Sequence, residues 1–209
     1  MVSDEIAKIG IVPVVAVESV DDGLKLCETL VKSGLSVAEI TFRTKAAAAT
    51  IAAVAKELPE LILGAGTVLN IDDLDKAFDS GARFAVSPGT NPKVVSYAMQ
   101  KSYDFFPGIS SPSDFEVAAD LGVRTFKFFP AEAAGGIKML KSLIGPYRHL
   151  GIKFCPTGGI NENNMLDYLS IPEVFAIGGS WMVKPDLMGH WDLMAVECRK
   201  AVEKAKTVV

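Results

Sequence analysis

The hydrophobic positions of the chain fall into short runs that recur at regular intervals from one end to the other. Eight of these runs are rich in β-branched or aromatic residues, which is typical of strands buried in a sheet. They cover residues 11–17, 37–44, 61–67, 84–88, 104–109, 125–130, 153–157 and 174–177. The pattern therefore predicts eight strands.

Helix-start signals lie between these runs. Ser19, Asn70 and Ser111 each precede a segment whose apolar residues have helical spacing, and each is a residue type that caps the amino end of a helix. Strands that alternate with helices are expected to run parallel and to be joined by right-handed crossovers. Eight such units predict an α/β fold, a (β/α)8 TIM barrel that forms a single domain over residues 1–209.

An open, doubly wound sheet is the competing architecture. Such a sheet usually carries a GxGxxG fingerprint directly after its first strand. Here the first predicted strand is followed by ESVDDG at residues 18–23, which lacks this fingerprint. The even repetition of eight strand–helix units also favours the barrel.

The composition argues against several classes of function. Of the 209 residues, 49% are hydrophobic, enough for one well-buried domain, and the formal net charge of -4 disfavours nucleic acid and anionic lipid as partners. Cys27, Cys155 and Cys198 are far apart and form no CxxC pair, which predicts reduced thiols rather than disulfides or a zinc site. The sequence has neither a signal peptide nor the roughly 18 consecutive apolar residues of a membrane span. We therefore expect a cytoplasmic protein without a membrane segment.

Charged residues occur inside two of the predicted strands. In residues 37–44, period-two alternation puts Glu39, Thr41 and Arg43 on one face and Ile40 and Phe42 on the other. The apolar face suits the helix layer, so the acid and the base are expected to point into the barrel, where an uncompensated charge is costly. Both a structural ion pair and a ligand site fit this strand.

Lys127 occupies a comparable position in residues 125–130 (TFKFFP). The phenylalanines on either side of it face one way, so Lys127 faces the other way and points inward, together with Phe129. A neutral lysine amine attacks carbonyl carbons and forms Schiff bases. Desolvation and a nearby Arg43 would favour the neutral amine, whereas Glu39 would favour the ammonium, so the sequence leaves this balance open. A surface lysine whose stem covers apolar residues is the alternative.

Glycines follow the last two predicted strands. TGGI at residues 157–160 and GGS at residues 178–180 lie in the two loops at which barrels commonly bind phosphate. Backbone N–H groups that glycine leaves accessible form an anion site, so a phosphorylated substrate is predicted. Glycines that only permit tight turns would give the same pattern. The third strand ends in GAGT at residues 64–67, whose small residues are expected to leave space beneath a ligand, and the Thr67 hydroxyl can donate to a carboxylate.

Six segments together resemble the 2-keto-3-deoxy-6-phosphogluconate (KDPG) and 4-hydroxy-2-oxoglutarate (KHG) aldolase family. They occur in the order of the family, between about residue 9 and about residue 184: EITFRT at 39–44, GAGTV at 64–68, SPG at 87–89, FKFFPAE at 126–132, PTGGI at 156–160 and GGS at 178–180. The resemblance implies a homotrimeric class I aldolase of the Entner-Doudoroff pathway, a carbon–carbon lyase that needs no metal or cofactor. Its implied reaction cleaves KDPG to pyruvate and glyceraldehyde 3-phosphate, and KHG to pyruvate and glyoxylate.

The same resemblance assigns roles to individual residues. Lys127 would form the Schiff base, and Glu39 would be the general acid and base. Arg43 and Thr67 would hold the pyruvate carboxylate. Further substrate contacts are expected from Pro88, Phe129, Thr157, Gly158, Gly159, Gly178 and Ser180, of which the three glycines and Ser180 would surround the phosphate. Residues 12–17 lack the arginine that some members place near the first strand.

Two other classes of function fit parts of the pattern. An isomerase or epimerase on a phosphate-binding barrel would need inward carboxylates or histidines on several strands, and only Glu39 meets that demand. His149 and His190 lie in late segments without metal-ligand spacing, so we expect them at the surface or in packing. A non-catalytic sugar-phosphate binding module would have no reason to bury Lys127. The prediction is therefore an aldolase whose partner is a small, phosphorylated keto acid.

Overall fold

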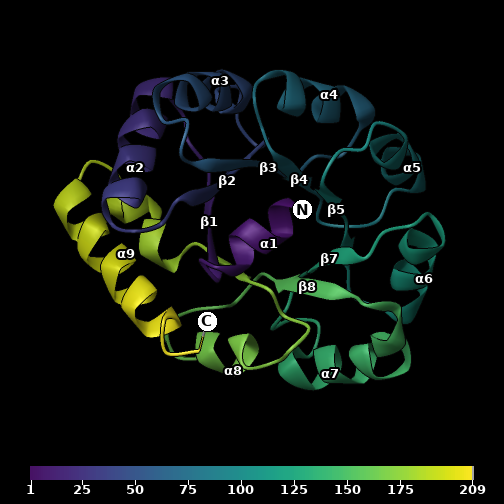
Figure 1. Ribbon diagram of the computed structural model, residues 1–209. Helices are drawn as coiled ribbons and strands as arrows, with labels where there is room; N and C mark the ends of the chain where they lie inside the picture. Colours follow the sequence, from purple (N-terminus) through teal and green to yellow (C-terminus); the bar gives the residue numbers. More distant parts are fainter. Residues whose placement is uncertain (209) are drawn as a thin grey trace.

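Two parallel sheets form the centre of the fold (Figure 1). The structure is a computed structural model that describes residues 1–208. A six-stranded sheet has the order β5-β4-β3-β2-β1-β9, and a three-stranded sheet has the order β6-β7-β8. The strands are β1 (Ile11–Val15), β2 (Val37–Thr41), β3 (Ile62–Gly66), β4 (Phe84–Val86), β5 (Phe105–Phe106), β6 (Gly108–Ile109), β7 (Thr125–Phe128), β8 (Lys153–Pro156) and β9 (Ile177–Gly179).

The two sheets meet on both sides. β5 and β6 follow one another with only Pro107 between them, and proline has no N–H to donate to a sheet ladder. On the other side, isolated parallel bridges join Phe154 to Val174 and Thr157 to Gly178. The result is a single-domain α/β fold with a curled parallel sheet. Helices α2 to α9 follow its outer face, which contradicts the doubly wound alternative because that fold needs helices on both faces (Figure 1).

The predicted strand regions are present, but several strands end earlier than predicted, and two runs differ further. The fifth predicted run is split at Pro107 into β5 and β6. The eighth strand begins at Ile177, the last residue of its predicted run, because Val174 lies beside β8 in an isolated bridge before the ladder with β1 begins. The expected single sheet of eight strands is thus found, within the described residues, as nine short strands in two sheets.

Helices surround the sheets and begin where their capping residues predict. The side chains of Ser19, Asn70 and Ser111 each accept a hydrogen bond from the backbone N–H three residues later, at 3.1, 2.8 and 3.2 Å. The outer helices are α2 (Val20–Lys32), α3 (Ala47–Glu57), α4 (Ile71–Asp79), α5 (Pro92–Gln100), α6 (Pro112–Asp120), α7 (Gly136–Tyr147), α8 (Met165–Leu169) and α9 (Trp191–Ala205), with 3-10 turns at Arg148–Leu150, Trp181–Val183 and Pro185–Leu187.

Alternate strand residues pack in opposite directions. Ile40, Phe126 and Phe128 point outward and join the large hydrophobic cluster between strands and helices. Inward residues form a second cluster that contains the rings of Phe84 and Phe106. The alternation predicted for the second and sixth strand runs is therefore confirmed within β2 and β7, that is, up to Thr41 and Phe128. No helix within residues 1–208 has both the length and the apolar character needed to cross a membrane.

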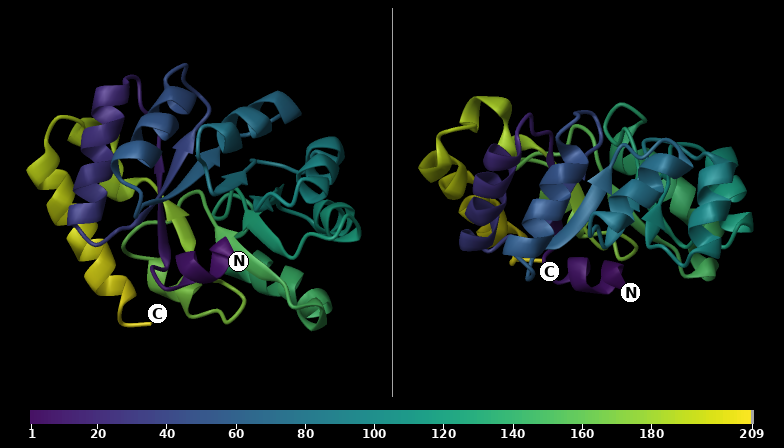
Figure 2. Two further views of the ribbon diagram at one scale, coloured as in Figure 1. Left: turned by 45° about the horizontal axis from the view of Figure 1, so that its top comes forward. Right: turned by 90° about the horizontal axis from the view of Figure 1, so that it is seen from above.

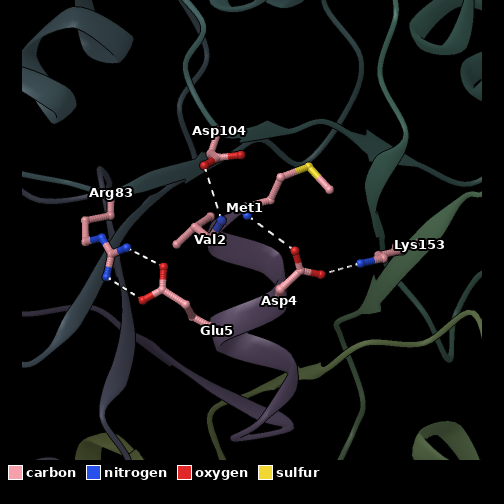
Figure 3. A network of polar contacts seen from close by, with 7 residues as sticks. All are labelled: Met1, Val2, Asp4, Glu5, Arg83, Asp104 and Lys153. Atoms are coloured by element: carbon pink, nitrogen blue, oxygen red, sulfur yellow. Dashed lines mark hydrogen bonds and ion pairs between the residues drawn. The ribbon is translucent and has the colours of Figure 1, made fainter.

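A short helix that the sequence did not predict, α1 (Val2–Ala7), covers the amino ends of the strands. It lies in the middle of the ring of strands in Figure 1 and on one side of the molecule in Figure 2. Its apolar residues Val2 and Ile6 are buried in the inner cluster. Its polar contacts, drawn in Figure 3, tie α1 to residues at or just before the amino ends of three strands: Arg83 Nη1 donates to Glu5 at 3.0 Å, Lys153 Nζ donates to Asp4 at 2.6 Å, and the Val2 N–H donates to Asp104 at 3.5 Å.

Candidate active site

A lysine and a glutamate from strands far apart in sequence meet inside the curled sheet. Lys127 on β7 donates through Nζ to Glu39 on β2, at 2.9 Å to Oε1 and 3.1 Å to Oε2. Lys127 is 6% exposed and Glu39 is 3% exposed. Both side chains point inward because their strand neighbours point toward the helices, as the alternation predicts. The hydrogen bonds of the pair are charge-assisted, and both groups are almost fully removed from water. In this setting the loss of either charge would leave the other one buried and uncompensated.

The surroundings of Lys127 Nζ are apolar apart from Glu39. The ring of Phe129 has its centroid 5.6 Å from Nζ, within range of a cation–π contact. A small cavity of about 10 Å³ borders the pair, lined also by Cys155, Thr157 and Phe106. Burial raises the pKa of the Cys155 thiol to about 12, so this thiol stays protonated beside the lysine. The Lys127 ammonium is thus hydrogen-bonded to Glu39, and the other side chains around it are mainly apolar.

The glycines of β3 leave room for neighbouring side chains. We expected the small residues at the end of this strand to leave space beneath a ligand. Instead, a Cβ at Gly66 would lie 2.2 Å from Glu39 Oε1, and a Cβ at Gly64 would lie 2.1 Å from the ring of Phe84. Gly66 is therefore the position that admits the Glu39 carboxylate into the interior.

Arg43 differs from its predicted position. β2 ends at Thr41, so the alternation that should have pointed Arg43 inward stops before reaching it. Arg43 lies in the following turn, is exposed, and donates through Nε to Thr41 Oγ1 at 3.1 Å. It lines an open hollow of about 480 Å³ at the carboxyl ends of β1 and β9, which Ser180 and the carboxylates Glu18 and Asp22 share. The structure thus places Arg43 at the rim, meaning the solvent-exposed loops at the carboxyl ends of the strands, and not beside the buried pair of Lys127 and Glu39.

Thr67 and Pro88 lie in loops at the same end of the sheet. Thr67 follows β3 directly and has a left-handed backbone with φ of 59°, which is unusual for a β-branched residue. Pro88 is exposed and lines a different hollow, together with Leu69 and Asn91. These two candidates are therefore at the carboxyl end but outside the immediate contacts of Lys127.

The glycine loop after β8 is held close to the loop after β7. Gly158 and Gly159 have φ of 101° and 80°, values that L side chains rarely adopt. Thr157 accepts at its carbonyl from Ala131 N–H at 2.8 Å, and Gly158 accepts from Glu132 N–H at 3.0 Å. The Gly159 N–H donates to no acceptor within the part of the chain that the structure describes, whereas the Gly158 N–H faces the carbonyl of Gly178 in the parallel bridge between Thr157 and Gly178. The Gly159 N–H remains available to an anion.

The second glycine-rich segment meets the first through Thr157. Gly178 on β9 faces Thr157 in a parallel bridge, and a Cβ at Gly178 would lie 2.3 Å from Thr157 Oγ1. Thr157 also borders the cavity beside Lys127. The structure therefore connects three predicted positions, Lys127, Thr157 and Gly178, while Ser180 lies with Arg43 at the rim. His149 and His190 are exposed, as predicted for surface residues.

Comparison with known proteins shows the family of this chain. A model of the family described as "KDPG and KHG aldolase" matches residues 2–198. The chain belongs to this family. It is 44% identical over 205 residues to the 2-dehydro-3-deoxy-phosphogluconate aldolase of Haemophilus influenzae, covering 97% of this chain and 96% of that protein. It is 43% identical over 198 residues to the KHG/KDPG aldolase of Escherichia coli strain K12, covering 94% and 92%.

Solved structures of aldolases share the fold. The KDPG aldolase of Legionella pneumophila, with pyruvate captured as a covalent carbinolamine intermediate, has a TM-score of 0.90 and 35% identity over 95% of this chain and 97% of that one. The 2-keto-3-deoxy-6-phosphogluconate aldolase of Zymomonas mobilis with 3-phosphoglycerate has a TM-score of 0.87 and 36% identity over 99% and 96%. The predicted membership of this aldolase family is confirmed.

Sequence reasoning missed four residues around this candidate site. Cys155 could have been found, because alternation along β8 puts it on the same inward face as Thr157. Gly66 carried a visible signal but was interpreted as space for a ligand. Glu132 and Tyr168, which hydrogen-bond to one another beside the glycine loop, carried no signal because 36 residues separate them.

Proposed function

We propose that this member of the aldolase family is a class I enzyme in which Lys127 forms a Schiff base with the C2 carbonyl of a keto acid. The observation that carries the proposal is the buried contact between Lys127 Nζ and the Glu39 carboxylate, 2.9 Å long. Support comes from the related Legionella pneumophila enzyme, in which pyruvate was captured as a covalent carbinolamine.

The pair supplies the proton movements of the first step. Glu39 accepts a proton from the Lys127 ammonium, and the resulting amine adds to the C2 carbonyl to give a carbinolamine. Protonated Glu39 then returns the proton to the departing hydroxyl, which leaves as water, and a protonated imine remains. The apolar walls around Nζ keep bulk water away from this intermediate.

The same carboxylate serves the cleavage step. Glu39, directly or through one water, removes the proton of the C4 hydroxyl, and the electron pair of the C3–C4 bond moves into the imine to give an enamine. The aldehyde leaves, Glu39 returns a proton to C3, and water hydrolyses the imine to release pyruvate. Each step uses groups of this chain, so we propose that no metal or cofactor takes part.

The rim residues would bind the two ends of the substrate. Arg43 and Thr67 would hold the carboxylate next to C2, with Pro88 and Phe129 packed beside the intermediate. Gly158, Gly159, Gly178 and Ser180 would bind the phosphate of KDPG, which yields pyruvate and glyceraldehyde 3-phosphate, and Thr157 would be a further substrate contact. The enzyme would also cleave unphosphorylated KHG to pyruvate and glyoxylate. The free N–H group of Gly159 supports this division.

The two competing functions lack comparable support. An isomerase or epimerase needs several acid and base groups around its substrate, yet Glu39 is the only carboxylate among the described residues that line the cavity at Lys127. A binding module gains nothing from a buried lysine that only one carboxylate neutralises.

We also propose that the two sheets act as one (β/α)8 barrel over residues 1–209 and that the chain forms a homotrimer, as the family resemblance implies. The bridges at Phe154 and Thr157, and the single residue between β5 and β6, support the barrel. Sedimentation equilibrium tests the trimer, since a mass other than three times that of the chain contradicts it.

Reductive trapping tests the aldolase proposal. The protein is incubated with pyruvate and borohydride after treatment with a chelator, and peptides are examined by mass spectrometry. We expect a reduced pyruvyl adduct on Lys127. Lys101, which is exposed and lies over the ring of Tyr97, is the internal control and should remain unmodified. An adduct on another lysine, or activity that the chelator abolishes, overturns the proposal.

A further inference from the structure

A tyrosine hydroxyl holds the side chain of Glu132 beside the glycine loop. Glu132 lies in the turn after β7, and its Oε1 accepts a hydrogen bond from the hydroxyl of Tyr168 on α8. Tyr168 is 0% exposed and is among the largest fully buried side chains, whereas Glu132 is exposed as a residue. One end of this contact is therefore fixed by packing, and the other belongs to a surface loop.

Glu132 also contacts the glycine loop directly. Its backbone N–H donates to the carbonyl of Gly158 at 3.0 Å. A Cβ at Gly159 would lie 2.7 Å from both Cβ and Cγ of Glu132, so the side chain lies directly against the backbone of that glycine. Both the main chain and the side chain of Glu132 thus contact the glycine loop.

The hydrogen bond that holds Glu132 persists across the working range of pH. Burial, and next the hydrogen bond to Glu132, raise the pKa of Tyr168 above its ordinary value of 10.0. The hydroxyl consequently remains protonated and continues to donate. A hydrogen bond to a charged acceptor is among the stronger ones in proteins.

The glycine loop needs such a restraint. Gly158 and Gly159 both have left-handed backbones and wide conformational freedom, so two adjacent glycines would sample many orientations if nothing bordered them. A loop whose N–H groups already point in the bound direction loses less entropy when it binds an anion.

We propose that Glu132 and Tyr168 are positioning residues that hold the Gly158–Gly159 loop in its anion-binding conformation and thereby set the preference for a phosphorylated substrate. Neither residue touches the reacting carbons. The inference rests on the proposed function for its substrates, but its central statement concerns the affinity of this loop for phosphate.

The test compares Tyr168→Phe, which removes only the hydroxyl, with Tyr147→Phe. Tyr147 is a matched control because its hydroxyl donates to Glu116 at 2.7 Å on the outer surface, away from the glycine loop. Inorganic phosphate is the probe, and its dissociation constant is measured by titration calorimetry on the full chain. We expect Tyr168→Phe to weaken phosphate binding by about fivefold to twentyfold, less than the roughly 10–100-fold effect of a direct hydrogen bond to a charged group because the hydroxyl acts through Glu132, and we expect Tyr147→Phe to leave phosphate binding unchanged.

Kinetics provide a second readout that loss of structure alone would not give. In Tyr168→Phe, KM for KDPG should rise by the same factor as the phosphate dissociation constant. The kcat for KDPG, and both kcat and KM for KHG, should stay within about twofold of the wild-type values. Glu132→Gln keeps an acceptor for the hydroxyl and should show a smaller rise than Glu132→Ala. An equal loss on KDPG and KHG, or unchanged phosphate binding in Tyr168→Phe, overturns the proposal.

The two proposals can fail separately. A wild-type protein that forms the Lys127 adduct but does not bind phosphate contradicts the positioning role and leaves the Schiff base intact. A protein that binds phosphate through Tyr168 and Glu132 but forms no adduct contradicts the aldolase and leaves the positioning role intact.

Discussion

The two ends of the strands carry ion pairs of opposite character. At the carboxyl ends, Lys127 and Glu39 meet with side chains that are 8% and 4% exposed. At the amino ends, Arg83 and Glu5 are each 47% exposed, and Lys153 and Asp4 are 36% and 53% exposed (Figure 3). All three pairs are shorter than 3 Å, so geometry alone does not distinguish them.

The two ends differ in how far solvent reaches their ion pairs. Exposed ion pairs are screened and contribute little, so those of α1 mainly orient a helix whose Val2 and Ile6 provide the burial. A buried pair must offset the desolvation of both charges, which hydrophobic residues of similar size would avoid. The carboxyl end therefore retains a pair that stability alone does not favour, as expected where charged groups perform chemistry. Variants at each end test this difference between the two kinds of ion pair.

Lys127→Met should have the largest effect. It removes the nucleophile, so turnover should fall to background, and it leaves Glu39 without its buried partner, which typically costs about 3–5 kcal/mol of unfolding free energy. Adding Glu39→Met should recover most of that stability but no activity, because a second unbranched apolar side chain follows the path of the carboxylate. Urea denaturation and an aldehyde-release assay measure both quantities. A double variant less stable than Lys127→Met would mean that the pair itself stabilises the fold.

Glu39→Gln should have the next largest effect. The amide keeps the shape but cannot accept protons, so kcat should fall by about 10²–10⁴, the usual contribution of a general acid or base. Borohydride should still trap pyruvate on Lys127, although more slowly. Glu18→Gln is the control, because Glu18 lines the open hollow and does not contact Lys127. An equal loss of kcat in both variants would show a general charge effect and not proton transfer.

Arg43→Ala should act mainly on binding. Loss of a hydrogen bond to a charged group costs about 1.5–3 kcal/mol, which corresponds to a rise of KM for the keto acid of roughly 10–100-fold. Arg43 is exposed, so folding should hardly change. Arg43→Lys should recover part of the affinity, since lysine keeps the charge but not the planar fork. An unchanged KM in the alanine variant would assign Arg43 to holding Thr41 only.

Arg83→Ala should have the smallest effect. We expect a slight decrease in the midpoint of thermal unfolding and no change in kcat/KM, because the site lies at the opposite end of the strands. The hydrogen bond from Arg83 lowers the pKa of Glu5, and that from Lys153 lowers the pKa of Asp4. These ion pairs contribute to the free energy of unfolding above the ordinary pKa values, 4.5 for Glu5 and 3.8 for Asp4. The contribution is lost as pH falls through the lowered values. The difference in midpoint between wild type and variant should therefore shrink below about pH 4, and a growing difference would contradict this interpretation.

The sequence predicted the parts of the site that depend on strand periodicity. Glu39 and Lys127 lie in regular strands, so alternate facing was enough to place both side chains inside. Arg43 was misplaced because the strand ends two residues earlier, and strand ends are the least regular part of such a pattern. Pro107 could have indicated the break in the fifth strand, since proline cannot donate to a ladder.

Other features were beyond any local pattern. α1 is short, and the six residues Val2–Ala7 show too little periodicity to separate a helix from a loop, yet burial of Val2 and Ile6 stabilises it in the fold. The contact of Glu132 with Tyr168 joins the turn after β7 to helix α8, and these segments meet only after the strands pair. Such contacts follow from tertiary structure and leave no trace at fixed spacing.

Thr67 has a consequence for improving this protein in the laboratory. Its left-handed backbone costs roughly 1–3 kcal/mol, which glycine would avoid and asparagine would lessen. A library selected only for heat resistance should therefore accumulate Gly or Asn at position 67 and lose the hydroxyl proposed to bind the keto acid. Selection that couples heat to turnover should keep threonine and collect its stabilising changes elsewhere.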